Sequence, residues 1–222
     1  MAISLVSASR KLLQRAPLSP WRFAAYLRYW DRNGPQRAAQ HARNIQRIAL
    51  LSRFIAPGGV GAELGVHKGY FSPVLLEGLA PEKLYLIDPW YLQGKQWTWG
   101  EGNRRAVDAL CRILRELEDE LAIGKAVLWI DDDLVALTRM PDEHLDWAYL
   151  DTTHEYDQTA RELQLLKQKV KPGGIIAGDD WRRDPSHPHH GVCKAVQAFV
   201  NCERCTLVHA DEISMQWILR LA

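Results

Sequence analysis

Cysteine is scarce in this sequence, with four residues in a chain of 222. At this length, four cysteines do not indicate the disulfide framework that stabilises small secreted domains. Cys202 and Cys205 form a Cys-x-x-Cys pair, but the chain contains no second pair of this kind. A zinc site that combines this pair with the nearby Cys193, His187, His189 and His190 is therefore only weakly indicated.

Long apolar runs are also missing. No run approaches the roughly 20 apolar residues that a membrane-spanning helix needs. The start of the chain lacks the continuous apolar core of a secretory signal. Residues 1–23 contain arginine and serine but no acid, which resembles a transit peptide, although an ordinary basic helix is the simpler interpretation. We therefore expect a soluble, cytoplasmic protein.

Acidic residues are nearly absent from the first part of the chain. Residues 1–62 contain ten lysine or arginine residues and one acid, Asp31, whereas the whole chain has a net charge of only +1. We interpret residues 1–43 as a basic helical extension that packs on the acidic remainder as a lid or forms a homo-oligomer. Binding to an anionic surface or substrate is the alternative. The segment contains no recognisable nucleic-acid module, so we expect no nucleic-acid partner.

From residue 60 onward, short apolar runs alternate with helical patterns. The runs predict strands at residues 60–64, 83–88, 126–131, 145–151 and 174–179, and helical patterns lie at about residues 69–79, 102–121 and 155–170. This alternation is typical of a parallel sheet with helices on both faces. A further helix and two closing strands, CTLVHA and SMQWILRL, follow. We therefore predict an α/β fold with a seven-stranded, mostly parallel sheet and a C-terminal antiparallel hairpin.

Each of the five predicted parallel strands ends in an acid. These acids are Glu63, Asp88, Asp131–Asp133, Asp151 and Asp179–Asp180. Ligands of open α/β sheets bind outside the carboxyl ends of the strands, so we expect these side chains to line one crevice. A single acid could be explained as a helix N-cap, whereas five in succession predict a ligand site.

The loop after the first predicted strand reads ELGVHKGYFS, from Glu63 to Ser72. Gly65 and Gly69 allow a sharp turn and a close approach of the backbone to a ligand. Their spacing is not the Gly-x-Gly-x-x-Gly of dinucleotide-binding sheets, while Asp88 at the end of the second strand is suited to bind ribose hydroxyl groups. These features fit NAD and S-adenosylmethionine (SAM) about equally, so an NAD-dependent oxidoreductase is one alternative function.

The segments ELGVHKGYFS, LYLIDPW and LDWAYLDTTHEYDQTARELQLLKQKVKPGGIIAGDDW resemble a class I SAM-dependent methyltransferase. More narrowly, they resemble the metal-dependent small-molecule O-methyltransferases, both the macrocin-type sugar enzymes and the catechol type. The resemblance implies a Rossmann-like methyltransferase domain at residues 44–222. It also implies the cofactor-binding residues, which are Glu63, Gly65, Gly69 and Ser72 near the methionine end of SAM, Asp88 at the ribose diol and Asp132 beside the adenine.

Asp151, Asp179 and Asp180 supply three carboxylates from two strands that we expect to be neighbours. Hard divalent cations such as Mg²⁺ prefer oxygen ligands, and the set matches the metal site of the resembling O-methyltransferases. A bound cation would stabilise the alkoxide that forms when an acceptor hydroxyl group loses its proton. The alternative is that Asp180 caps a helix and Asp179 is a solvated loop residue.

The resemblance also implies a general base three residues after Asp151, where His154 stands. An imidazole with a pKa near neutrality is suited to take a hydroxyl proton. Asp151 is the alternative base, and His154 could instead cap a helix. The implied reaction is SAM-dependent methylation of a hydroxyl group on a sugar, a phenol or another natural product. A relative that keeps the site without methylating, as the cephalosporin-hydroxylase-like proteins suggest, is a further alternative.

Two segments are candidates for the acceptor pocket. Residues 89–100 are aromatic and contain glycines, and they could form a lid over a sugar or an aromatic ring. The loop at residues 182–190 leaves directly from Asp180 and contains Arg182 and Arg183, either of which could bind an anionic group. An ordinary exposed loop is the alternative for residues 182–190.

Overall fold

The computed structural model describes residues 38–92 and 104–222. Contacts within the chain divide it into two units, Met1–Ala42 and Arg43–Ala222. The predictions for residues 1–37 and for residues 93–100 of the aromatic segment lie outside the described residues. Residues 38–51 are helical, and every strand described below belongs to the second unit.

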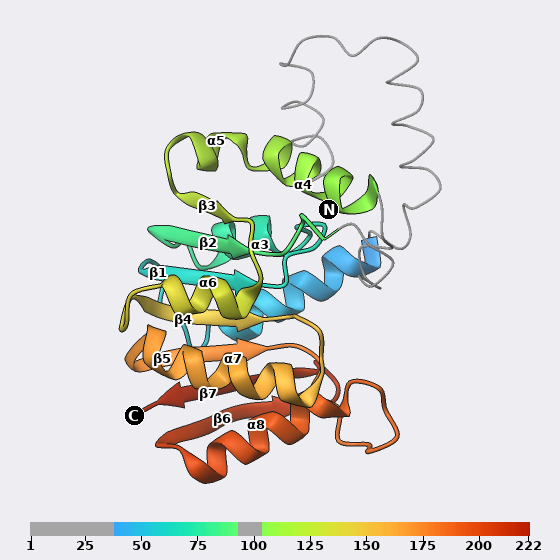
Figure 1. Ribbon diagram of the computed structural model, residues 1–222, viewed down its shortest axis with the longest axis vertical. Coiled ribbons are helices and arrows are strands. Elements are labelled where there is room, and N and C mark those ends of the chain that lie inside the picture. The colour runs from blue at the N-terminus through green and yellow to red at the C-terminus, as the bar shows by residue number, and fades with distance from the viewer. Residues whose placement is uncertain (1–37, 93–103) are drawn as a thin grey trace. The chain divides into compact units, whose positions relative to one another are not determined.

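A seven-stranded sheet forms the centre of the second unit (Figure 1). Its strands are β1 (Val60–Leu64), β2 (Lys83–Ile87), β3 (Ala126–Trp129), β4 (Leu145–Leu150), β5 (Val170–Gly178), β6 (Cys205–Asp211) and β7 (Gln216–Leu221). They follow the order β3-β2-β1-β4-β5-β7-β6 across the sheet. The first five strands are parallel, and β7 is antiparallel to both β5 and β6. This arrangement confirms the predicted mostly parallel sheet with a C-terminal hairpin.

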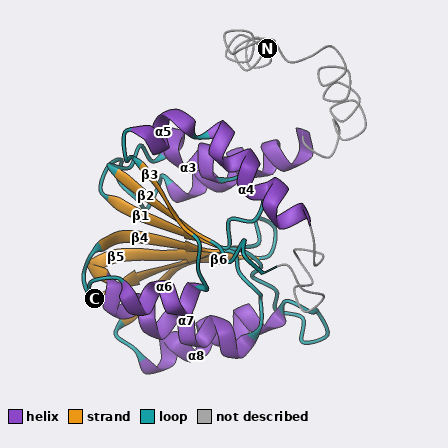
Figure 2. Ribbon diagram, turned by 45° about the horizontal axis from the view of Figure 1, so that its top comes forward, coloured by secondary structure: helices purple, strands orange, loops and turns teal. Residues whose placement is uncertain are grey.

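Helices cover both faces of the sheet (Figure 2). They are α3 (Ser72–Gly78), α4 (Arg104–Glu116), α5 (Glu118–Ala122), α6 (Asp133–Arg139), α7 (Tyr156–Lys169) and α8 (His190–Cys202). The last three pack on one face, while α3, α4 and the helical residues up to 51 contribute to the core on the other face. Within the described ranges, no helix has the length and apolar character needed to cross a bilayer.

Several predicted elements differ from the structure in their bounds. Strand β3 ends at Trp129, two residues before the predicted end at residue 131. The helix predicted from residue 69 begins at Ser72, because residues before it form the turn in which the Gly69 N–H bonds the Val66 carbonyl oxygen. The long helix predicted at residues 102–121 is two helices, α4 and α5. Strand β5 begins at Val170, four residues earlier than predicted, because Val170 pairs with Leu145 before a register shift.

Alternation along β4 divides its side chains between two apolar cores. Ala148 and Leu150 pack with α6, α7 and α8, whereas Trp147 and Tyr149 pack with α3, α4 and the helix that precedes β1. Side chains of a strand alternate between the faces. The ring of Tyr149 therefore extends toward the helical residues 43–51, and this contact shapes the site described below.

The core on the α6–α8 face can be tested by truncating one side chain of α6. Leu137 is fully buried, whereas Val135 on the same helix is 38% exposed. We expect Leu137→Ala to lower the free energy of unfolding by about 2–5 kcal/mol, because it leaves a cavity in a packed core. Val135→Ala is the matched control and should change it by about 0.5 kcal/mol or less. Urea denaturation measures both, and equal losses would contradict this packing.

Candidate active site

The acids from which the sequence predicts a ligand site lie at the carboxyl ends of β1, β2, β4 and β5. Glu63 lies on β1, while Asp88, Asp151 and Asp179 directly follow β2, β4 and β5. Three of these four acids are nearly fully buried, and Asp151 is half-buried. A buried carboxylate is unfavourable unless it is paired or hydrogen-bonded. The partners of each acid therefore indicate what this edge of the sheet is built to hold.

The loop after β1 packs directly on the end of β4. The Ser72 hydroxyl group donates a hydrogen bond of 2.6 Å to Glu63 Oε2, and burial raises the pKa of Glu63 to about 8. Gly65 has a φ of 83°, and a Cβ there would lie 2.0 Å from the carbonyl oxygen of Asp151. Only glycine fits at this contact. Gly69 also has a positive φ, of 64°.

Asp88 is fixed by the same loop. Its Oδ2 accepts a hydrogen bond of 2.7 Å from the backbone N–H of His67. The Trp90 indole N–H donates to the His67 carbonyl oxygen at 2.8 Å. Burial raises the pKa of Asp88 to about 7. The structure thus gathers the five predicted cofactor residues Glu63, Gly65, Gly69, Ser72 and Asp88 in and beside one loop.

Asp132, the sixth predicted cofactor residue, caps a helix. It is the N-cap of α6, and its carboxylate accepts hydrogen bonds from the backbone N–H groups of Leu134 at 3.0 Å and Val135 at 3.4 Å. Its neighbour Asp131 forms an ion pair of 2.7 Å with Arg139. These partners explain both acids structurally, so contact between Asp132 and an adenine stays a prediction.

Two arginines outside the predicted site neutralise the acids that follow β4 and β5. Arg43 Nη2 lies 2.6 and 2.7 Å from the two carboxylate oxygens of Asp179. Arg47 Nη2 lies 2.8 Å from Asp151 Oδ2 and 3.0 Å from Asp179 Oδ2. Both arginines belong to the helical residues 43–51 that precede β1. This edge of the sheet therefore carries its own counter-charge.

Arg47 is part of a closed polar network inside the protein. Its side chain is 4% exposed, and its guanidinium carbon lies 4.3 Å from the ring centroid of Phe71. Arg47 Nε donates to the Tyr149 hydroxyl oxygen at 2.8 Å. That hydroxyl group donates to Gln216 Oε1 at 2.6 Å, and Gln216 Nε2 donates to Asp179 Oδ1 at 2.7 Å. The network thus joins the ends of β4, β5 and β7.

The three carboxylates predicted to hold magnesium lie together. One oxygen each of Asp151, Asp179 and Asp180 is within 4.8 Å of the others. However, both oxygens of Asp179 have guanidinium partners, and Asp151 Oδ2 is paired with Arg47. Magnesium requires a nearly complete shell of oxygen ligands. This set does not fit Mg²⁺ while Arg43 and Arg47 hold these positions, so the magnesium site stays a prediction.

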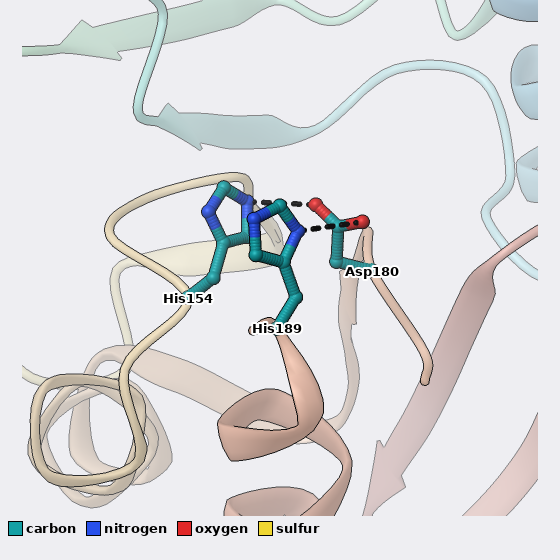
Figure 3. Close-up of side chains that lie close together, drawn as sticks. All are labelled: His154, Asp180 and His189. Carbon is teal, nitrogen blue, oxygen red and sulfur yellow. Dashed lines mark ion pairs between the residues drawn. The ribbon is translucent and has the colours of Figure 1, made fainter. Parts of the chain in front are cut away.

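Asp180 faces imidazole groups instead of the two arginines (Figure 3). His154 Nε2 lies 2.9 Å from Asp180 Oδ2 and 3.2 Å from Asp151 Oδ1. His189 Nδ1 lies 3.1 Å from Asp180 Oδ1. The rings of His154 and His189 are stacked, with centroids 4.4 Å apart and an angle of 12° between their planes. The structure therefore brings the predicted catalytic pair, Asp151 and His154, into contact with Asp180.

The charge of His154 follows from these neighbours. Burial by itself lowers the pKa of His154, but hydrogen bonds and charge from Asp151 and Asp180 outweigh burial and raise it to about 10. The same contacts hold the pKa of Asp180 well below its usual range, against the effect of burial. His154 thus carries a proton at neutral pH. Burial raises the pKa of Asp151, but the hydrogen bond from His154 and the charge of Arg47 outweigh burial and lower it below its ordinary value. Asp151 is therefore the unprotonated member of the predicted pair, and its partners make it a weak base.

The loop at residues 182–190 reaches this cluster through a residue that the sequence did not single out for it. His189, the N-cap of α8, contacts Asp180 directly, while Arg182 Nε lies 4.0 Å from Asp180 Oδ1. Arg183 is exposed. Within the described ranges, neither of the two groups of possible metal ligands contains a cysteine, so Cys202 and Cys205 are not part of this site.

Arg43 and Arg47 could have been found from their spacing. They are four residues apart and so lie on the same side of a helix, next to a chain segment that carries several unpaired strand-end acids. The helical spacing of Ile45, Ile48 and Leu51 indicates a buried apolar side away from the two arginines, and Ile48 and Leu51 are indeed buried. In the structure Ile45 is 47% exposed and Arg47 is 3% exposed.

Residues 62–181 match the sequence profile of a family described as Methyltransferase domain. No curated protein matches the sequence. Many solved structures resemble this one, and the three given next do so at low sequence identity. A protein from Methanococcus maripaludis described as a SAM-dependent methyltransferase has a TM-score of 0.58 at 13% identity, covering 87% of this chain and 90% of that chain.

A protein from Streptococcus mutans, described as a methyltransferase and solved in complex with SAH, has a TM-score of 0.54 at 15% identity. The match covers 79% of this chain and 95% of that chain. A protein from Clostridium thermocellum described as an rRNA methylase has a TM-score of 0.56 at 13% identity, covering 80% and 94%. At these identities the likeness shows a shared fold.

The buried arginine can be tested by removing its charge. Arg47→Met leaves Asp151 Oδ2 without its guanidinium partner and takes one of two guanidinium groups from Asp179. We expect it to lower the free energy of unfolding by about 3–5 kcal/mol, because breaking a buried ion pair leaves an uncompensated charge. Urea denaturation measures the loss, with Arg53→Met on the exposed surface as control. Similar stabilities of the two variants would show that the network contributes little.

The buried acid of β1 predicts a pH dependence of stability. The pKa of Glu63 is raised from 4.5 to about 8, so between these pH values the unfolded chain has lost this proton and the folded chain keeps it. The free energy of unfolding therefore falls as the pH rises through this window. The glutamine in Glu63→Gln cannot lose a proton. We therefore expect the free energy of unfolding of this variant, minus that of the wild type, to be larger at pH 8 than at pH 5. Urea denaturation at both pH values measures this, and a pH-independent difference would refute it.

Proposed function

Because the chain belongs to the family of methyltransferase domains and shares the fold of SAM-dependent enzymes, we propose that it transfers a methyl group from SAM to a hydroxyl group of a small molecule. The observation that supports this most directly is the contact between the loop after β1 and the end of β4. It sets the predicted cofactor loop beside Asp151 and His154. NAD-dependent hydride transfer has no comparable support.

The loop after β1 and the end of β2 offer groups suited to SAM. SAM supplies an activated methyl group on a positively charged sulfur. Glu63 and Asp88 are buried carboxyl groups whose pKa values burial raises to about 8 and about 7. A cationic ligand beside Glu63 would stabilise its charged form. In this proposal residues 63–72 hold the methionine end, Asp88 binds the ribose hydroxyl groups, and the α6 cap at Asp132 lies beside the adenine.

The acceptor hydroxyl group would be activated at Asp151 and His154. An alcohol becomes a good nucleophile when it loses its proton. In this proposal Asp151 Oδ1, 3.2 Å from His154 Nε2, accepts that proton as the hydroxyl group attacks the methyl group, since the lowered pKa of Asp151 does not favour removal of the proton beforehand. His154 in its protonated form would stabilise the negative charge that develops on the acceptor oxygen. Magnesium at Asp151, Asp179 and Asp180 is the alternative source of positive charge. No step is assigned to it, because Arg47 would first have to leave these carboxylates.

The proposed function also assigns a role to each part of the chain and a class of acceptor. We propose residues 44–222 as the catalytic domain and residues 1–43 as a lid or oligomerisation arm of a cytoplasmic protein. The acceptor would be a sugar, a phenol or another natural product, and no nucleic acid would be needed. The role of residues 1–43 as an arm is supported by charge, because residues 1–62 contain ten basic residues and only one acid.

Two substitutions separate cofactor binding from methyl transfer. Asp151→Asn should lower kcat by about 100-fold or more, since it removes the proton acceptor, while SAM affinity measured by calorimetry should stay within about twofold because a neutral amide disturbs the cofactor loop little. Asp88→Asn should instead weaken SAM binding by about 10-fold or more, as expected for loss of a charged hydrogen-bond acceptor. Asp142→Asn is the matched control, because Asp142 is an exposed acid that pairs with Lys169 at the last residue of α7, away from this site.

Activity is measured with radiolabelled SAM on a panel of sugars, phenols and polyketide alcohols. SAM binding without transfer to any of these acceptors would favour a relative that keeps the site without methylating hydroxyl groups. Binding of NAD without binding of SAM would overturn the proposed function. Transfer to RNA but to no small molecule would replace the acceptor class.

A further inference from the structure

We propose that His154, Asp180 and His189 bind a divalent transition-metal ion, such as Zn²⁺ or Co²⁺, through two imidazole nitrogens and one carboxylate. The site shares Asp180 with the magnesium site predicted from the sequence, but two imidazole nitrogens replace the carboxylates of Asp151 and Asp179. It deepens the proposed function and rests on it for its catalytic meaning, but ion binding can be measured without SAM or an acceptor.

Three chain segments bring these donors together (Figure 3). His154 lies in the loop between β4 and α7, Asp180 follows β5, and His189 is the N-cap of α8. One nitrogen from each histidine and one oxygen from Asp180 lie within 4.8 Å of one another. The donors are His154 Nε2 at 2.9 Å and His189 Nδ1 at 3.1 Å from the two Asp180 oxygens.

These separations are close to those that a shared ion requires. Zinc ligands lie roughly 2.0–2.2 Å from the ion in a tetrahedral arrangement, so two of them are about 3.4 Å apart. The two imidazole rings are stacked nearly in parallel, with 12° between their planes, so modest rotation of the side chains must accompany binding. His189 is 27% exposed, which gives an ion a path from solvent.

Among the residues that the structure describes, Asp180 has no guanidinium group within hydrogen-bonding distance, although Arg182 lies at ion-pair distance. Arg43 and Arg47 neutralise Asp179 and one oxygen of Asp151. The remaining carboxylate, Asp180, has two histidines at hydrogen-bonding distance, and Arg182 Nε lies beyond that distance at 4.0 Å. A transition-metal ion held by the two imidazole nitrogens would supply the positive charge that Asp180 requires.

The donor set selects the kind of ion. Imidazole nitrogen suits Zn²⁺, Co²⁺, Fe²⁺ and similar ions, whereas Mg²⁺ prefers an all-oxygen shell. Three protein ligands leave a coordination position open, which is the arrangement of catalytic zinc sites. An acceptor hydroxyl oxygen could occupy this position within reach of Asp151 Oδ1, itself 3.2 Å from His154 Nε2. The metal would then lower the pKa of the hydroxyl group that Asp151 deprotonates.

The test begins with full-length protein that has been dialysed against a chelator and then titrated with Zn²⁺, Co²⁺ and Mg²⁺ by calorimetry. We expect one Zn²⁺ or Co²⁺ to bind each chain at this site, with Mg²⁺ binding much more weakly. Imidazole nitrogen resonances of two histidines should shift with Zn²⁺, and bound Co²⁺ should give visible absorption bands typical of a site with few ligands. Failure of the wild type to bind Zn²⁺ or Co²⁺ would overturn the proposal.

His189→Gln removes one of the donors. It should weaken Zn²⁺ binding by more than the roughly 10- to 100-fold that loss of an outer-sphere partner costs. His144→Gln is the matched control, because His144 lies before β4, at the other end of that strand, and bonds the Tyr85 hydroxyl group at 2.9 Å. It should leave Zn²⁺ affinity within about twofold, as expected for a residue with no contact to the ion. Equal effects of the two variants would overturn the proposal.

Two further measurements distinguish failure of the metal inference from misfolding of the variant and from failure of the proposed function. The histidine resonances in the wild type give an answer even if His189→Gln does not fold, and Mg²⁺ binding that matches Zn²⁺ binding would point to the carboxylates instead. SAM affinity is measured in the same samples. Metal binding without SAM binding would refute only the proposed function, and SAM binding without metal binding would refute only this inference.

Discussion

The buried guanidinium group of Arg47 is the interaction on which this end of the molecule depends. Parallel strands bring Asp151 and Asp179 to adjacent positions, and two carboxylates in a low-dielectric environment repel each other. Arg47 bridges them at 2.8 and 3.0 Å. Because Arg47 also stacks on Phe71 from the loop after β1, the loop that we assign to the cofactor and the strand ends that we assign to the acceptor share one support.

The same network determines which side chains at this edge of the sheet are left to contact a ligand. Tyr149, although buried and polar, donates its hydroxyl proton to Gln216, and Gln216 in turn holds Asp179. These groups satisfy one another and have no capacity left for a ligand. The neighbouring groups outside this network are Asp151 Oδ1, His154, Asp180 and His189. The acids at this edge of the sheet look alike in the sequence. In the structure, Asp179 belongs to the buried network, while Asp180 belongs to the group that we propose to act on a ligand.

Much of the fold could be predicted because it depends on local patterns. Alternating apolar runs and helical stretches predicted seven strands, and acids such as Glu63 and Asp88 predicted the edge at which ligands bind. The counter-charge could not be predicted in this way. Arg47 is separated from Asp179 by 132 positions in the sequence, and their contact arises only from the packing of the helix before β1 on the α3 face. The bounds of β5 likewise depend on a register shift against β4, which is a tertiary feature.

The adjacent pair Asp179–Asp180 shows how one sequence motif can serve two purposes. Asp179 is 3% exposed and takes both its oxygens to guanidinium groups of the helix before β1. Asp180 has a φ of 59°, in the left-handed region that few residues other than glycine, asparagine and aspartate adopt. The chain turns there, and the second carboxylate meets His154 and His189 instead. Both acids directly follow β5, yet the turn places Asp179 against Arg43 and Arg47, while Asp180 lies beside the two imidazole groups that we propose as metal ligands. Any cation that this site recruits from solution is therefore expected at Asp180.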